Sequence, residues 1–175
     1  MSSELRVDRI IPTTGVPTGG GGGIVQIKSV TKTDTFSNAS TSITDVTGLS
    51  VSITPRSSSS KILVSYNLTC GTEDSSYQFG IRLVRDSTAI FVGDAAGSRE
   101  RVSNFARNNG SDRHTIYPSG QHLDSPNTSS SVTYKLQIVS YTAGRALHIN
   151  KVHNDSDDNS IGRSASSLTV MEVSG

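Results

Sequence analysis

The stretch Lys61-Ile62-Leu63-Val64-Ser65-Tyr66-Asn67-Leu68 decides the fold class. Within it, large apolar side chains recur at every second position, at Ile62, Val64, Tyr66 and Leu68. Successive side chains of a β-strand point to opposite faces, so a period of two places all four on one face, whereas a helix would scatter them. The stretch therefore predicts a half-buried antiparallel β-strand.

Three further stretches have the same alternation. They are Leu49, Val51 and Ile53; Tyr77, Phe79, Ile81 and Leu83; and Val132, Tyr134, Leu136 and Ile138. Shorter candidate strands span 24–30, 89–92, 102–105, 114–117, 147–149 and 168–173. Clusters of Ser, Gly, Asn, Asp and Pro separate these segments, as turns require. About ten short strands predict an all-β fold: an antiparallel β-sandwich, jelly-roll-like, over residues 24–175.

The composition agrees with a turn-rich β protein that has a thin core. Ser, Thr, Gly and Asn account for 74 of 175 residues, whereas Ile, Leu, Val and Phe account for only 41. A lone sandwich with so few strong apolar residues is marginal, and self-association would bury one more surface. Val139 also lies on the face opposite Ile138, which indicates a strand covered on both sides. We therefore expect a homo-oligomer.

Charge and hydropathy exclude several classes of function. The net charge of +1 provides no field that would attract nucleic acid or an anionic membrane. Apolar runs stay well short of the roughly 18 residues of a membrane span, and the first residues lack the apolar core of a signal peptide. The single cysteine, Cys70, forms no internal disulfide and is expected to be a small buried hydrophobe.

Residues 1–23 differ from the rest and predict an extended anchor followed by a glycine linker. The expected anchor residues are Leu5, Arg6, Val7, Ile10 and Ile11. The five consecutive glycines 19–23 are expected to form a flexible linker, because glycine loses more backbone entropy on ordering than any other residue. Leaving four aliphatic side chains in water is unfavourable, so we expect this segment to dock onto a partner. The alternative is a disordered leader without a role.

Several segments carry a resemblance to a known group of proteins. They are Ser3-Glu4-Leu5-Arg6-Val7-Asp8 with Ile10-Ile11-Pro12, the glycine tract leading into Ile24-Val25-Gln26, Gly48 to Pro55, Lys61 to Leu68, Leu123-Asp124-Ser125-Pro126 leading into Val132-Thr133-Tyr134, and Leu168 to Val173. Together they resemble small tail-fibre-like structural proteins of tailed bacteriophages, of the marine phage and cyanophage type. The similarity touches most of the chain, although each motif is short.

The resemblance implies a non-enzymatic virion protein that is made in the host cytoplasm and located on the exterior of the tail or capsid. It further implies a trimer, attached to another virion protein through residues 1–23 and involved in host-surface attachment. Tail fibres usually carry a long shaft, whereas here about 23 residues precede the first expected strand. A fibre tip, a collar or head fibre, and a capsid decoration protein therefore remain as alternatives.

A basic and aromatic stretch provides the candidate surface contact. Its residues are Arg101, Arg107, Arg113, His114 and Tyr117. Arginine offers forked donors to carboxylates or phosphates, and tyrosine offers a flat apolar face with a polar edge. We expect this stretch to contact a host cell-surface glycan or protein. The alternative is a solvated rim or a contact between protomers.

No spacing in the chain indicates catalysis, so the sequence predicts no enzyme, catalytic residue or cofactor, with a glycan depolymerase as the remote alternative. Asp155, Asp157 and Asn159 copy only the first ligands of a calcium loop, which indicates a solvated acidic loop and leaves cation binding open. His148 and His153 are five apart, so on a continuous strand they would face opposite sides. We therefore expect no metal site.

Overall fold

The computed structural model describes residues 23–73 and 76–174, and every regular element in it is a strand. The strands are β1 (Ile24–Lys32), β2 (Phe36–Asn38), β3 (Thr44–Ile53), β4 (Lys61–Asn67), β5 (Cys70–Thr72), β6 (Gln78–Arg85), β7 (Thr88–Ile90), β8 (Asn104–Arg107), β9 (Thr115–Ile116), β10 (Ser119–Asp124), β11 (Val132–Ser140), β12 (Leu147–Ile149) and β13 (Ser166–Val173). No helix in this part of the chain has the length and apolar character to cross a membrane.

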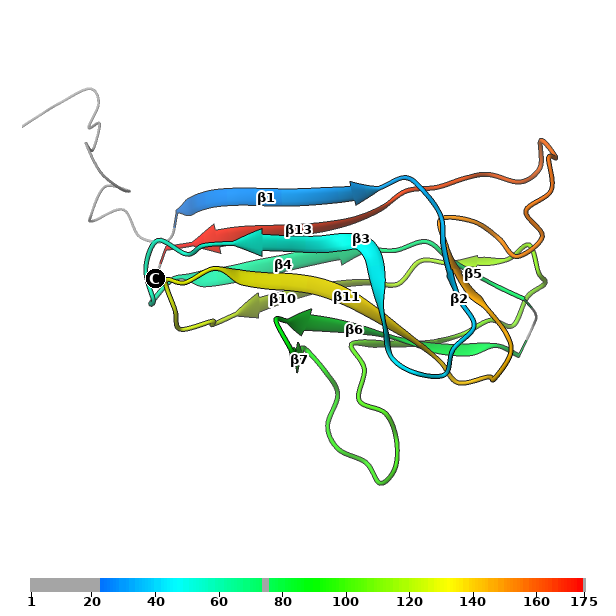
Figure 1. Ribbon diagram of the computed structural model, residues 1–175, viewed down its shortest axis with the longest axis horizontal. Coiled ribbons are helices and arrows are strands. Elements are labelled where there is room, and N and C mark those ends of the chain that lie inside the picture. The colour runs from blue at the N-terminus through cyan, green and yellow to red at the C-terminus, as the bar shows by residue number, and fades with distance from the viewer. Residues whose placement is uncertain (1–22, 74–75, 175) are drawn as a thin grey trace, which may run out of the picture.

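The order of the strands is that of a jelly roll. One sheet has the order β1-β13-β4-β10, and the facing sheet has the order β3-β11-β6. The other edge of β6 pairs with two short strands in succession, β8 along its first half and β7 along its second half. Every pairing is antiparallel, and the chain crosses repeatedly from one sheet to the other (Figure 1). This is the double Greek-key arrangement of two facing sheets, so the predicted fold class is confirmed.

The two ends of the sandwich differ. At one end β1 begins beside the end of β13, and the Ser174 amide donates a hydrogen bond to the Gly23 carbonyl at 3.0 Å. At the other end the connections between the large sheets pair with one another as a third sheet, β2-β12-β5-β9 (Figure 1). The described chain thus enters and leaves at the end opposite this small sheet.

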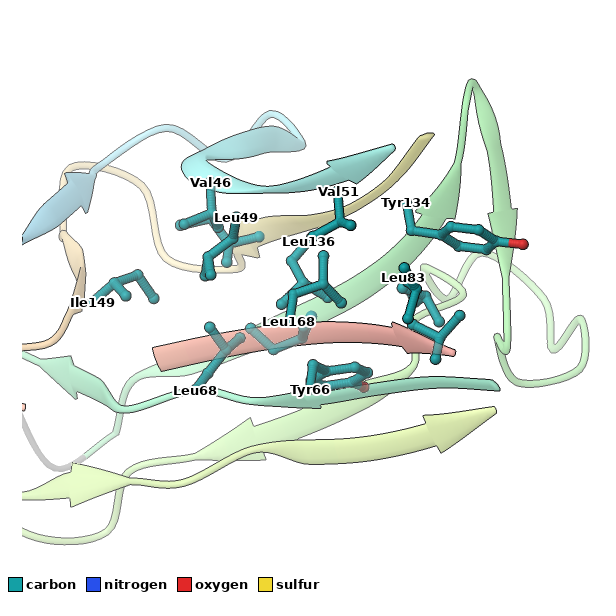
Figure 2. Close-up of a cluster of buried hydrophobic side chains, with 14 of the residues drawn as sticks. Val46, Leu49, Val51, Tyr66, Leu68, Leu83, Tyr134, Leu136, Ile149 and Leu168 are labelled. Carbon is teal, nitrogen blue, oxygen red and sulfur yellow. The ribbon is translucent and has the colours of Figure 1, made fainter. Parts of the chain in front are cut away.

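The core lies between the two large sheets and contains all four of the predicted apolar faces. Leu49, Tyr66, Leu83, Leu136 and their neighbours are almost fully buried, and Figure 2 shows them converging from both sheets. Burying each such side chain contributes on the order of 1.5–3 kcal/mol. The expected burial of Cys70 is also confirmed, and burial raises the pKa of its thiol well above the ordinary value.

The strand β10 was not predicted, because Pro118, Ser119 and Gly120 together have the composition of a turn. Instead, Gly120 lies within β10, opposite Tyr66 of β4. A Cβ atom at Gly120 would lie 2.5 Å from the Tyr66 ring, so the glycine permits a close approach of the aromatic ring to the backbone. The candidate strand 114–117 is correspondingly reduced to Thr115–Ile116.

Candidate functional site

The five residues of the predicted surface contact are placed in two separate groups. Arg101 lies in the segment 91–103 and Arg107 lies in β8, both near the edge of β6 that pairs with β7 and β8. Arg113 and Tyr117 line a different hollow, beside the small sheet, while His114 packs against Gly110. The structure thus places Arg113 and Tyr117 on one hollow and does not join all five residues in one surface.

The larger hollow is a groove of about 790 Å³ on the outer face of the sheet that contains β6 and β11. Among its lining residues are Gln78, Arg99, Glu100, Val102, Phe105 and Tyr141. The rings of Phe105 and Tyr141 lie 5.8 Å apart between centroids and are 60% and 37% exposed. Arg107 follows Phe105 by two positions on β8, so it projects from the same face, beside the groove.

One wall of the groove is formed by the segment 91–103, which loops out beyond the edge of β6 (Figure 1) and contributes Ser98, Arg99, Glu100 and Val102 to the lining. The Ser103 amide donates to the Ile81 carbonyl at 2.7 Å, and the Arg101 Nε donates to the Gly93 carbonyl at 2.6 Å. Gly80 of β6 is required underneath, because a Cβ atom there would lie 2.6 Å from Val102 and 2.8 Å from the Tyr141 hydroxyl. Arg101 therefore links the two arms of this segment, a role that the sequence had not indicated.

The burial of Val139 has an explanation within one chain. Its side chain is 4% exposed and lies on the outer face of the sheet, beside Tyr141 and Val102 of the same chain. The two-sided covering of β11 was expected to come from a second protomer. At this position that expectation is wrong, because the segment 91–103 provides the cover.

The smaller hollow, of about 240 Å³, lies beside the small sheet and is polar. Arg113, Thr115 and Tyr117 line one side, and the segment 160–164 lines the other. The Tyr117 and Thr115 hydroxyls are hydrogen-bonded at 2.7 Å, and Arg113 lies 3.8 Å from the Asp158 carboxylate. Arg113 is therefore paired with an acidic side chain, as is Arg163, which also lines this hollow and lies 2.5 Å from Asp155.

The acidic loop that follows the small sheet is bound to basic residues. Asp155 accepts hydrogen bonds from the Arg163 guanidinium at 2.8 and 2.5 Å, and the Lys151 ammonium lies 3.6 Å away. Asp158 accepts the Ser160 amide at 2.9 Å, and this contact, with the Ser160 hydroxyl, lowers the pKa of the Asp158 carboxyl. The two carboxylates thus have different hydrogen-bond partners.

The expectation that His148 and His153 face opposite sides is wrong. His148 Nε2 lies 3.1 Å from His153 Nδ1, because the chain does not continue as a strand after β12. Asn150 has a φ of 64°, and this left-handed turn brings the chain back over the small sheet. An asparagine directly after a strand is the one sequence signal that could have indicated the turn.

The environment of His148 determines its chemistry. Burial, followed by the nearby charges of Lys151 and His153, lowers the pKa of His148 to about 4, so its imidazole is neutral at pH 7. Its Nδ1 lies 2.8 Å from the Ser37 hydroxyl. So weak a base is poorly suited to activate a serine at neutral pH. A neutral imidazole is instead the form that binds metal ions.

The predicted anchor residues Leu5, Arg6, Val7, Ile10 and Ile11 lie outside the described residues.

Comparison with known proteins gives a distant match in shape only. No family model matches the chain, and no curated protein matches its sequence. The structure of infectious bursal disease virus, Gx strain, superposes with a TM-score of 0.46 and 13% sequence identity. The superposition covers 93% of this chain but only 42% of the viral chain. The jelly-roll assignment rests on the strand order itself.

Proposed function

We propose that this chain is a non-enzymatic structural protein of a bacteriophage virion, attached to the particle through residues 1–23 and displaying the jelly roll toward the host surface. The observation that carries the proposal is the polarity of the sandwich. Gly23, the last residue of the proposed anchor segment 1–23, is hydrogen-bonded to Ser174 at one end, whereas the small sheet lies at the other. An anchored copy would therefore present the small sheet and the adjoining groove outward.

The groove is the proposed attachment surface, in preference to the smaller hollow. Its lining includes Gln78, where β6 begins, and Ser140, where β11 ends. These two strand ends lie toward the small sheet (Figure 1). Phe105 and Tyr141 offer aromatic faces, and Arg99 and Arg107 offer donors at its margin. Aromatic rings and guanidinium groups suit the apolar ring faces and the hydroxyl or carboxylate groups of bacterial surface glycans. A cell-surface glycan is the ligand class that these side chains favour.

We further propose that the protein assembles as a trimer through the outer face of the sheet β1-β13-β4-β10. An apolar row crosses all four strands in register: Ile27 pairs with Met171, Met171 with Leu63, and Leu63 with Leu123. Ile27 and Leu123, at the two edges, are 56% and 48% exposed. We favour other copies of this chain as the partners that cover this row, because with so thin a core self-association is the main remaining way to bury apolar area.

The same apolar row favours a second candidate, a capsid decoration or head-fibre protein with a purely structural role. In that case the row and residues 1–23 would both contact the particle, and the groove would bind no host ligand.

Binding of the fluorescently labelled protein to bacterial cells, measured by flow cytometry, tests the attachment role. We expect saturable binding to cells of a susceptible strain, weakened at least about tenfold by Phe105→Ala and by Arg107→Ala. Arg56→Ala, an exposed arginine outside the groove, is the matched control and should bind like the wild type. Binding to purified virions but to no cells would favour the decoration role. Release of reducing sugars from host polysaccharide would contradict a non-enzymatic function.

A further inference from the structure

Three potential metal ligands converge beside the small sheet. Glu73 follows β5, His148 lies in β12, and His153 lies in the loop after β12. One ligand atom from each side chain lies within 4.8 Å of the others, and the two imidazole nitrogens are 3.1 Å apart. Metal–ligand bonds of about 2.0–2.2 Å place the ligands of a tetrahedral ion about 3.3–3.6 Å from one another. Small side-chain rotations would bring the three atoms to that spacing.

The register of the small sheet explains why these residues meet. His148 lies opposite Gly71 of β5, and Glu73, two residues further along, projects from the same face as position 71. Gly71 also lets the following loop pass directly over β5, because a Cβ atom there would lie 2.8 Å from the Val152 Cα and overlap the Lys151 carbonyl. The loop thereby delivers His153 to the side of His148.

We propose that Glu73, His148 and His153 bind one divalent transition-metal ion, with zinc preferred and the remaining position open to water. Two imidazole nitrogens and one carboxylate oxygen form a ligand set typical of zinc, whereas calcium and magnesium prefer oxygen ligands alone. His153 is exposed, so an ion can enter from solvent.

Partners around two of the three side chains, His148 and Glu73, fix their orientations. The Ser37 hydroxyl, directly opposite His148 in the pairing of β2 with β12, lies 2.8 Å from His148 Nδ1. A proton on Nδ1, donated to that hydroxyl, leaves Nε2 unprotonated, with its lone pair directed toward His153. The Ala146 amide donates to Glu73 Oε1 at 2.8 Å, which fixes the orientation of the carboxylate.

The loop that carries His153 is fixed independently of any ion. The His153 amide donates to the Asp112 carbonyl at 3.1 Å. The Asn150 side chain donates to the Lys32 and Asp34 carbonyls at 2.8 and 2.9 Å. Because the backbone of the site is already ordered, an ion would have little loop entropy to overcome. An ion bound here would cross-link the loop to β5.

Calorimetric titration of the chelator-treated, full-length chain with ZnCl₂ tests the proposal, with Co²⁺ absorption as an independent report on imidazole ligands. We expect one ion per chain. Ser37→Ala should weaken zinc binding about tenfold, as loss of an outer partner does, and His153→Gln should weaken it more. His122→Gln, a histidine of β10 outside the cluster, is the matched control and should bind zinc like the wild type.

Since His148 is buried and its replacement can unfold the small sheet, the exposed His153 and the partly exposed Glu73 provide the decisive variants. Each must first give the circular dichroism spectrum of the wild type. The absence of zinc binding by the wild type, or equal binding by folded His153→Gln and Glu73→Gln, would overturn the proposal.

Discussion

Tyr134 of β11 donates a hydrogen bond across the sandwich to Asp124 of β10, with 2.7 Å between Oη and Oδ2. Arg85 of β6 donates to both oxygens of the same carboxylate, at 2.8 and 2.7 Å. Burial and the Asp124 carboxylate raise the pKa of Tyr134 well above its ordinary value, so the phenol keeps its proton and remains a donor. This buried group joins the two large sheets where the core approaches its end.

Tyr134→Phe should destabilise the fold by about 2 kcal/mol, the contribution of a hydrogen bond to a charged group. Asp124→Ala should cost more, about 3–5 kcal/mol, because it leaves Arg85 and Tyr134 without their shared acceptor. Urea denaturation measures both changes. Thr133→Ala, which removes an exposed hydroxyl pair with Ser52, is the control and should change stability by less than about 0.5 kcal/mol. A control effect equal to that of Tyr134→Phe would contradict the assigned role.

Gly71→Ala should destabilise the protein by more than about 1 kcal/mol and also weaken zinc binding. The new methyl group would collide with the backbone of Lys151 and Val152, which cannot move without displacing His153. Gly162→Ala is the matched control, since nothing lies within 4 Å of its Cβ position. The control should be neutral or slightly stabilising. If Gly71→Ala retained wild-type stability, the close approach of this loop to β5 would be wrong.

Glu172 makes the stability of the fold depend on pH. Burial raises the pKa of the Glu172 carboxyl. Hydrogen bonds from Gln26, Ser60 and the Arg56 amide lower this pKa by a larger amount, so the net pKa lies below the ordinary 4.5. The unfolded chain therefore binds this proton at higher pH than the folded chain does. The stabilisation that the ionised Glu172 carboxylate provides is complete above about pH 4.5, and it is lost as the pH falls through the pKa of Glu172 in the folded protein.

Urea denaturation of the wild type and of Glu172→Gln between pH 6 and pH 3 measures this dependence. The stability of the variant should fall less steeply below about pH 4.5. Parallel curves for the two proteins would show that the carboxylate contributes nothing to acid sensitivity.

The long strands could be predicted from the sequence because their apolar period is local. Leu49 and Leu136 lie on regular alternating stretches, and both are buried as expected. The alternation states which face of a strand is buried, but it does not identify what covers the opposite face. The position of Val139 correctly indicates a strand covered on both sides, but residues of the same chain, Val102 and Tyr141, lie beside it, so this position gives no evidence for a second protomer.

The small sheet and the cluster beside it could not be predicted in the same way. Strand β5 has only three residues, Cys70–Thr72, too few to show a period. The proximity of His148 and His153 depends on the positive φ of Asn150 and on the missing side chain of Gly71. These are properties of pairing between distant segments, so inspection of residues 148–153 alone could not reveal them.

The apolar row across the outer sheet face predicts which substitution breaks the assembly. Leu63→Lys places a charge in the middle of the row, between Met171 and Leu123, on a face that does not touch the core. The variant should fold, with a circular dichroism spectrum like that of the wild type, but should no longer associate. Ser65→Lys is the matched control. Ser65 lies two positions further along β4 on the same face, opposite Thr169 and outside the apolar row, so its replacement should weaken association less.

The native mass of the full chain, measured by sedimentation equilibrium at a few micromolar, tests the account of a trimeric virion module most directly. We expect a mass about three times the 18.5 kDa of one chain for the wild type, and 18.5 kDa for Leu63→Lys. A wild-type mass of 18.5 kDa would contradict the trimer and remove the role assigned to the apolar row.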